Sequence, residues 1–286
     1  MIAAFKEMEL WSFNMASIAF IGAGNMAEAI ARGLLRTAAY QPGDIFATDP
    51  NADRRRVFAD DLGIPCTDDS CDLKVASADV IVIAVKPFVV AEALQQIQPR
   101  ADALFVSIAA GISTAFIEQT LASKKSPLPA ARVIRVMPNT PMLVGKGISA
   151  LCRGKNASEQ DLIAAERIFS AGGKTVRVTE DLMDAVTALS GSGPAYVFFL
   201  TEALTQAGVA AGLSAGQAAQ LARQTVIGSA ELLAQAKDSP EDLRRKVTTP
   251  NGTTQAAIET LQAGDFSGLM TKAIAAAAKR SKELQK

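Results

Sequence analysis

The chain has 286 residues, 49% hydrophobic and 20% charged, a composition typical of a globular protein with a large core. Lys+Arg and Asp+Glu each number 29, so no net field attracts nucleic acid or an anionic membrane surface. Histidine is absent and the three cysteines lack metal-ligand spacing, which excludes Ser-His-Asp and Cys-His catalysis and the usual zinc sites; no metal is expected.

The first residues lack the continuous apolar core of a signal peptide, and Met15 is a second candidate start directly before the first predicted strand. We interpret residues 1–14 as an N-terminal extension without an assigned role. No uninterrupted apolar run of about 18 residues is present, so no membrane span is expected. Three reduced thiols are then the simplest interpretation of the cysteines, and they predict a cytoplasmic protein.

Strands and helices alternate over residues 15–179. The predicted strands are residues 18–21, 44–48, 79–85, 103–109 and 132–137, with edge strands at 147–152 and 175–178. The predicted helices run up to residue 35, over residues 89–98, after Ser113, and from a Ser158 cap to the glycines at 172–173. The alternation of continuously apolar strands with helices predicts an α/β domain with a Rossmann-like, doubly wound, mostly parallel sheet.

Residues 180–286 lose the strand pattern and predict an all-α C-terminal domain of about five or six helices. The last helix carries one apolar stripe, made of Phe266, Leu269, Met270, Ala273, Ile274 and Ala277. A helical domain this small would bury more area by pairing with a second copy. We therefore expect a homodimer, or a higher oligomer of dimers, through this domain; an intrachain bundle is the alternative.

A glycine motif follows the first strand and opens the first helix. In Gly22-x-Gly24-x-x-Ala27, Gly22 permits the tight turn, Gly24 lets a pyrophosphate approach the backbone, and Ala27 allows close helix–strand packing. This arrangement predicts a dinucleotide site at the turn. Its predicted cofactor contacts are Ile21, Gly22, Ala23, Gly24, Asn25 and Met26.

The second strand ends at Asp49, at the distance expected for an acid that binds a ribose hydroxyl. Asp49 would favour NAD because it would repel a 2′-phosphate. Arg54, in the run Arg54–Arg56, could instead clamp that phosphate. The residues leave both choices open.

Two further strands end in polar or glycine-containing segments at the edge where open α/β sheets bind ligands. Further predicted cofactor contacts there are Ala84, Val85, Lys86, Pro87, Ala109 and Ala110. Lys86 would meet a phosphate or ribose of the cofactor. Asn139, with Thr140, follows the fifth strand and could order the loop near the nicotinamide.

The glycine motif and five other segments occur in the order and spacing of pyrroline-5-carboxylate reductase, which the chain resembles from about Ser17 onward. These segments are AVKP (84–87), SIAAG (107–111), RVMPNTP (135–141), LSGSGPAY (189–196) and TTPNGTT (248–254). The resemblance implies hydride transfer from NADPH, or alternatively NADH, to the C=N carbon of 1-pyrroline-5-carboxylate. The product would be L-proline, in the last step of proline biosynthesis, at a site built between two protomers.

The same resemblance assigns the substrate contacts to the helical domain. It implies that Thr249, Gly252, Thr253 and Thr254 bind the substrate carboxylate, with Thr254 nearest the imine nitrogen as the catalytic candidate. Ser192 is a further substrate contact, at the start of the helix that joins the domains. The chain departs from the family at Asn251, where a glycine is usual, although Asn tolerates left-handed backbone better than most residues.

Two other functions fit parts of the pattern. A hydroxyacid dehydrogenase of the hydroxyisobutyrate or phosphogluconate type also joins a dinucleotide domain to helices, but it uses a catalytic lysine in the helical domain. Here Lys237 and Lys246 lie in polar stretches. A non-enzymatic dinucleotide sensor would explain the glycine turn and the pairing of two copies, but not the second, hydroxyl-rich turn.

Overall fold

The computed structural model describes residues 17–284, so the predicted extension at residues 1–14 lies outside the described residues. Within that range the chain forms two compact units. One comprises residues 17–191 together with residues 278–284, and the other comprises Ser192–Ala277. The expected domain boundary after residue 179 stays a prediction.

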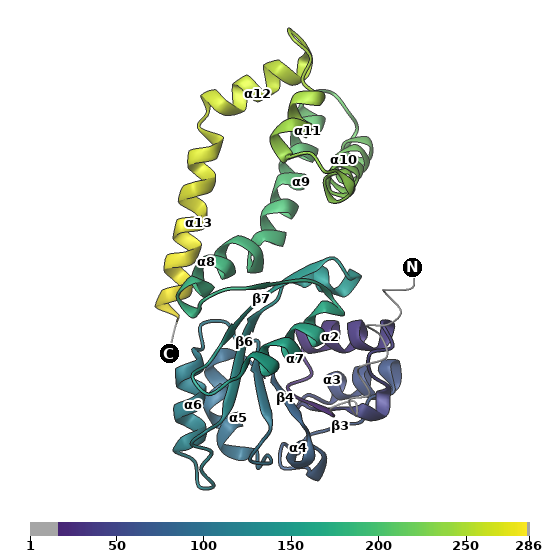
Figure 1. Cartoon of the computed structure of the whole chain (residues 1–286). Coiled ribbons are helices and arrows are strands. Elements are labelled where there is room, and N and C mark those ends of the chain that lie inside the picture. Colours follow the sequence, from purple (N-terminus) through teal and green to yellow (C-terminus); the bar gives the residue numbers. More distant parts are fainter. Residues whose placement is uncertain (1–16, 285–286) are drawn as a thin grey trace, which may run out of the picture. The chain divides into compact units, whose positions relative to one another are not determined.

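The first unit contains an eight-stranded sheet in the order β3-β2-β1-β4-β5-β6-β7-β8 (Figure 1). Its strands are β1 (Ile18–Ile21), β2 (Ile45–Thr48), β3 (Cys66–Thr67), β4 (Val80–Ile83), β5 (Leu104–Ser107), β6 (Arg132–Met137), β7 (Gly147–Arg153) and β8 (Gly173–Arg177). Neighbouring strands are parallel except β6 and β7, which are antiparallel. The predicted Rossmann-like, mostly parallel sheet is confirmed.

Both faces of the sheet are covered by helices. Those of this unit are α2 (Asn25–Arg36), α3 (Ala52–Arg56), α4 (Leu73–Ser77), α5 (Val90–Gln96), α6 (Thr114–Ala122), α7 (Glu159–Ser170) and α8 (Met183–Val186). The two predicted caps are present. Ser113 Oγ accepts a hydrogen bond from Phe116 N, and Ser158 forms a reciprocal capping box with Asp161.

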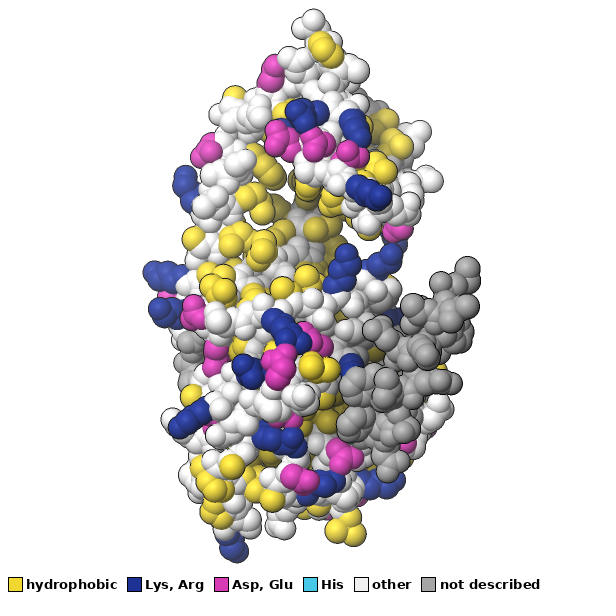
Figure 2. Space-filling view, in the orientation of Figure 1, with side chains coloured by type: hydrophobic (Ala, Val, Ile, Leu, Met, Phe, Trp, Pro, Cys, Tyr) yellow, Lys and Arg dark blue, Asp and Glu magenta, His cyan; other side chains and the backbone are white. Residues whose placement is uncertain are grey.

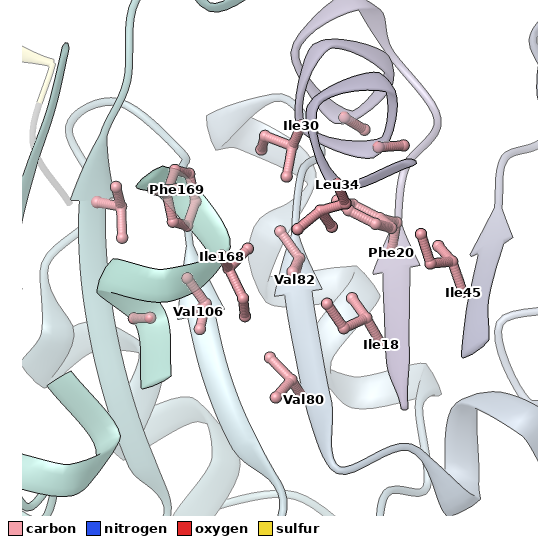
Figure 3. Packing of buried hydrophobic residues seen from close by; sticks show 14 of the residues in the cluster. Ile18, Phe20, Ile30, Leu34, Ile45, Val80, Val82, Val106, Ile168 and Phe169 are labelled. Carbon is pink, nitrogen blue, oxygen red and sulfur yellow. The ribbon is translucent and has the colours of Figure 1, made fainter. Parts of the chain in front are cut away.

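The core divides into two layers because successive strand residues point to opposite faces of the sheet. Phe20 and Val82 pack with Leu34 of α2 and Phe169 of α7 in one cluster, as Figure 3 shows. Alternate residues of the same strands, such as Ile81, pack in the other cluster with residues of α5 and α6. Burial on both faces explains why these strands are apolar at every position.

Some predicted boundaries were wrong. The apolar runs 79–85 and 103–109 extend past the ends of β4 and β5, because their last residues leave the sheet and line a cavity described below. The strand β3 and the helix α4 were not predicted. Each is too short, at two and five residues, to show a periodic pattern.

The second unit is helical, as predicted. Its helices are α9 (Gly193–Ala210), α10 (Ala215–Gln235), α11 (Pro240–Lys246), α12 (Thr253–Ala263) and α13 (Phe266–Glu283), the last of which ends in the first unit. Among the described residues, no helix is both long and apolar enough to cross a membrane.

The helical unit buries few of its side chains. Of residues 192–277, only Ala218 and Ala222 are buried, whereas Phe198 and Phe199 are 63% and 70% exposed. Leu269, in the predicted stripe of α13, is 62% exposed. Figure 2 shows apolar side chains, in yellow, open to view on these helices. Apolar surface of this extent is typical of a protein–protein interface.

The three cysteines predict a selective labelling pattern. All three are free thiols; Cys71 is exposed, whereas burial raises the pKa of Cys66 to about 11 and that of Cys152 to about 12. Because the thiolate is the reactive form, a thiol reagent at pH 8 should modify Cys71 rapidly, the half-buried Cys66 much more slowly, and the buried Cys152 only on unfolding. Mass spectrometry of the labelled protein checks this. Rapid labelling of the Cys71→Ser variant would contradict it.

Candidate functional site

A cavity of about 700 Å³ lies at the carboxyl ends of the central strands. The strand order reverses between β1 and β4, and ligands of open α/β sheets bind at such a switch point. The cavity is lined by the β1–α2 turn and by the segments that follow β2, β4, β5 and β6. Its lining residues are Gly22, Gly24, Asn25, Met26, Ala29, Asp49, Pro50, Ala84, Val85, Lys86, Pro87, Val89, Ile108, Ala109, Ala110, Thr140 and Leu143.

The glycine turn has a glycine at two positions, each for a different reason. Gly22 has φ = 99°, and a Cβ there would lie 2.8 Å from the Ala84 carbonyl oxygen, so no other residue fits. Gly24 is the N-cap of α2, and a Cβ there would meet no heavy atom within 4 Å. Since no capping side-chain bond is present at this N-cap among the described residues, the first N–H groups of α2 are available to an anion approaching across Gly24.

Most of the predicted cofactor contacts come together in this cavity. Gly22, Gly24, Asn25, Met26, Asp49, Ala84, Val85, Lys86, Pro87, Ala109 and Ala110 line it. Four others do not: Ile21 ends β1 and is buried, Ala23 is buried within the turn, and Arg54 and Asn139 bond to other parts of the chain. The role of each residue as a cofactor contact stays a prediction.

Asp49 lines the cavity and also ties the turn to the end of β2. Its Oδ2 accepts a hydrogen bond from Ala23 N at 2.8 Å, and its Oδ1 accepts one from Asn51 N at 2.8 Å. A carboxylate has about four acceptor positions, so Asp49 retains capacity for a ribose hydroxyl.

Arg54 contacts the glycine turn but does not line the cavity. Its Nε donates to the Ala23 carbonyl oxygen at 2.7 Å, and its Nη2 donates to Glu28 Oε2 at 2.7 Å. Burial raises the pKa of the Glu28 carboxyl, but hydrogen bonds from Arg54 and Arg32 outweigh it and bring the pKa below its usual value. Glu28 is therefore an ionised carboxylate in the first turn of α2, and the positive charges of Arg54 and Arg32 balance its negative charge.

Asn139 is buried and uses both ends of its amide within the first unit. Its Oδ1 accepts from Ile148 N at 2.9 Å, and its Nδ2 donates to the Ser190 carbonyl oxygen at 3.1 Å. Ser190 belongs to a π-helical turn, Thr187–Gly191, at the end of the first unit. Asn139 thus connects the start of β7 to the segment from which the chain leaves this unit.

The predicted contacts omitted five lining residues, Ala29, Pro50, Val89, Ile108 and Leu143, and a sixth, Thr140, was named only as part of the loop near the nicotinamide. Pro50 directly follows Asp49, and Ile108 lies inside the SIAAG segment, so proximity to a predicted contact was the available signal. Leu143 gave no such signal. It lies in a 3₁₀ turn, Thr140–Val144, whose direction depends on tertiary packing.

The predicted substrate contacts lie in the helical unit. Four of them are brought together where a turn enters α12: Gly252 is its N-cap, Gly252 N donates to the Thr249 carbonyl oxygen at 3.0 Å, and Thr253 and Thr254 open the helix. Within residues 17–284, the N-cap of α12 makes no side-chain capping bond, so the first N–H groups of the helix can meet an anion. Ser192 lies elsewhere in the unit, as the N-cap of α9.

Asn251 adopts a left-handed conformation, with φ = 57°, in this turn. Asn is among the non-glycine residues that accept such a conformation with least strain. Asn251 N also donates to Gln255 Oε1 at 2.8 Å, which ties the turn to the first turns of α12. Asn is therefore compatible with the backbone here.

Comparison with known proteins agrees with both halves of this description. Residues 17–111 match a family model described as NADP oxidoreductase, coenzyme F420-dependent, and residues 180–284 match pyrroline-5-carboxylate reductase dimerisation. With the cavity at the switch point, the first match defines the class of the protein, an NAD(P)H-dependent oxidoreductase with a Rossmann-like domain.

The relatives define the family within this class. A pyrroline-5-carboxylate reductase of Pseudomonas aeruginosa is 42% identical over 270 residues, which are 93% of this chain and 96% of that protein. The chain belongs to the pyrroline-5-carboxylate reductase family.

Solved structures of the same family superpose over nearly the whole chain. One from Coxiella burnetii is 37% identical with a TM-score of 0.86, covering 96% of this chain and 100% of that one. One from Plasmodium falciparum, solved with NADP bound, is 29% identical with a TM-score of 0.80, covering 95% and 98%.

The two hydrogen bonds of Asn139 predict a cost in stability when its amide is removed. Asn139→Ala removes both bonds of a buried amide and leaves the Ile148 N–H and the Ser190 carbonyl without these partners, so unfolding should become easier by about 1–3 kcal/mol. Denaturant titration followed by circular dichroism measures the change. The matched control is Asn156→Ala, an exposed site with one weak bond at 3.4 Å, where a change within about 0.5 kcal/mol is expected. Equal midpoints for both variants would refute the connecting role of Asn139.

Proposed function

We propose that this chain reduces 1-pyrroline-5-carboxylate to L-proline with NADPH as hydride donor, in the last step of proline biosynthesis. The observation that carries the proposal is the identity of 42% to a pyrroline-5-carboxylate reductase over 93% of the chain. A relative solved with NADP bound supports the choice of cofactor, with NADH as the alternative.

The cavity of the first unit fits such a cofactor. When bound, the reduced nicotinamide supplies the hydride. The uncapped start of α2 would hold the pyrophosphate, and Gly24 would let it approach the backbone. Lys86, which is exposed at the rim, would add a positive charge for a phosphate, and Asp49 would accept a ribose hydroxyl.

The turn at the start of α12 is the proposed site of the substrate carboxylate. Helix N–H groups and the hydroxyls of Thr253 and Thr254 together would form the anion site. A protonated imine is already electrophilic, so the protein needs mainly to orient the ring and exclude water. The imine carbon accepts the hydride, and the nitrogen retains its proton. A chain without histidine can perform this chemistry.

The alternative dehydrogenase receives no support. Such an enzyme would need a catalytic lysine in the helical unit, but Lys237 and Lys246 are both exposed, and Lys246 pairs with Asp238 at 2.7 Å. A purely sensory module is disfavoured because the relatives are named as reductases.

Association into dimers, or into oligomers of dimers, is part of the proposal. The match of residues 180–284 to a dimerisation family and the exposed apolar side chains of the helical unit support it. The cytoplasmic location and the absence of a nucleic-acid partner stay predictions.

The direct test is an assay of the purified protein. Adding 1-pyrroline-5-carboxylate should cause oxidation of NADPH, measured by loss of its absorbance, with formation of proline measured by chromatography. A 3-hydroxy acid with NADP⁺ serves as the control for the dehydrogenase alternative and should give no turnover. Failure to turn over the imine at any pH between about 5 and 9 would refute the proposal.

Thr254→Val tests the proposed carboxylate turn. Loss of one hydrogen bond to a charged group, worth about 1.5–3 kcal/mol, should lower kcat/KM for the imine by roughly 10- to 100-fold. The dissociation constant of NADPH should not change. Thr260→Val is the control, because Thr260 lies on the same helix and donates to the Ala256 carbonyl oxygen. Unchanged turnover by Thr254→Val would exclude Thr254 from the site.

A further inference from the structure

Both ionic residues that the sequence assigned to the ribose end of the cofactor bind the backbone of the same residue, Ala23, at the two adjacent peptide groups on either side of its Cα. Ala23, the residue between the two glycines, donates its N–H to Asp49 and accepts a hydrogen bond on its carbonyl oxygen from Arg54. Each bond is 2.7–2.8 Å long and involves a charged partner. Charge-assisted hydrogen bonds of this length are among the stronger ones in proteins. The orientation of the Ala23 backbone is therefore held from both sides.

The guanidinium of Arg54 is held in place by a second partner. Its Nη2 bonds to Glu28 Oε2 at 2.7 Å, and the Arg54 and Glu28 side chains are only 23% and 17% exposed. Arg54 does not line the cavity. To reach a 2′-phosphate, it would have to release both the Ala23 carbonyl and the Glu28 carboxylate.

The ion pair also changes the charge at the start of α2. Glu28 lies in the first turn of this helix, where its negative charge would compete with a pyrophosphate for the positive end of the helix. Arg54 and Arg32 both pair with it, at 2.7 and 2.8 Å, and neutralise that charge. The pair thus keeps the helix start favourable to an anion.

We propose that Arg54 is a positioning residue that supports the glycine turn through Ala23 and Glu28, and that it serves NADPH and NADH equally instead of selecting the 2′-phosphate. The inference rests on the proposed dinucleotide function of the cavity. In this role, Arg54 shapes the glycine turn and the start of α2, where the pyrophosphate of the cofactor would bind.

Its neighbour Arg56 provides a matched control. Arg56 is on the same short helix, but its side chain is 74% exposed and pairs with the surface residue Asp53, at 3.3 Å. Arg56→Met removes the same charge without touching the turn. Any effect that arises from net charge alone would be common to Arg56→Met and Arg54→Met.

The experiment measures the dissociation constants of NADPH and NADH by fluorescence titration without substrate, at one fixed salt concentration. Arg54→Met should weaken both cofactors by roughly 5- to 50-fold, because a displaced turn misaligns the N–H groups for either one. The ratio of the two constants should stay within about twofold of that for the unmodified protein. Arg56→Met should leave both constants within about twofold.

Arg54→Lys separates the two roles. An ammonium can bind a 2′-phosphate, but it lacks the fork that bridges Ala23 and Glu28, so the positioning role predicts weakened binding of both cofactors. Because Arg54→Lys retains a positive charge beside Glu28, it keeps the test open if Arg54→Met fails to fold. Thermal unfolding of each variant verifies that it is folded.

The outcomes are distinct. A loss confined to NADPH in Arg54→Met that Arg54→Lys restores would overturn the inference, as would unchanged constants for both cofactors. An equal weakening of both cofactors in Arg56→Met would also overturn it, because the effect of Arg54→Met would then arise from net charge alone. Failure of the unmodified protein to bind either dinucleotide would instead refute the proposed function.

Discussion

The close approach of Gly22 to the end of β4 is the constraint on which the dinucleotide cavity depends. Gly22 N donates to the Thr48 carbonyl oxygen, and Ala84 N donates to that of Ile21, each at 2.8 Å, so the turn is fixed between its two neighbouring strands. A side chain at Gly22 would push the turn away from β4 and would have to adopt φ = 99°. This contact sets the position of the start of α2 and of the Ala23 backbone. It also sets the width of the cavity at the switch point between β1 and β4.

Much of the fold could be predicted because the central strands are buried on both faces. The strands β1 and β4 are apolar at every position, and two helices of the unit carry caps at Ser113 and Ser158, so local patterns and the final structure agree. Strand ends were harder, since Ala84 and Val85 are as apolar as β4 itself and differ only in lining a cavity. Elements as short as β3 carry no periodic signal.

The site was predicted less completely, for a physical reason. Glycine spacing and strand order place Gly24 and Lys86 at the binding edge, and both line the cavity. The partners of charged side chains depend instead on neighbours that are distant in sequence. Nothing near Arg54 in the sequence indicates that its partners are Ala23 and Glu28. Nor do the neighbours of Asn139 indicate that its side chain connects Ile148 with Ser190. Those contacts needed the tertiary structure.

The C-terminal residues return the chain to its first unit. Residues 278–284 belong to the same unit as residues 17–191, and Ser281 Oγ donates to Asp184 Oδ1 at 2.7 Å. The unit that contains the cavity is thus discontinuous in sequence, and residues 192–277 form an insertion within it, with both ends anchored in the same host domain. Truncation of the chain after residue 277 would therefore remove part of the Rossmann-like unit, although the cut falls within a helix of the C-terminal region.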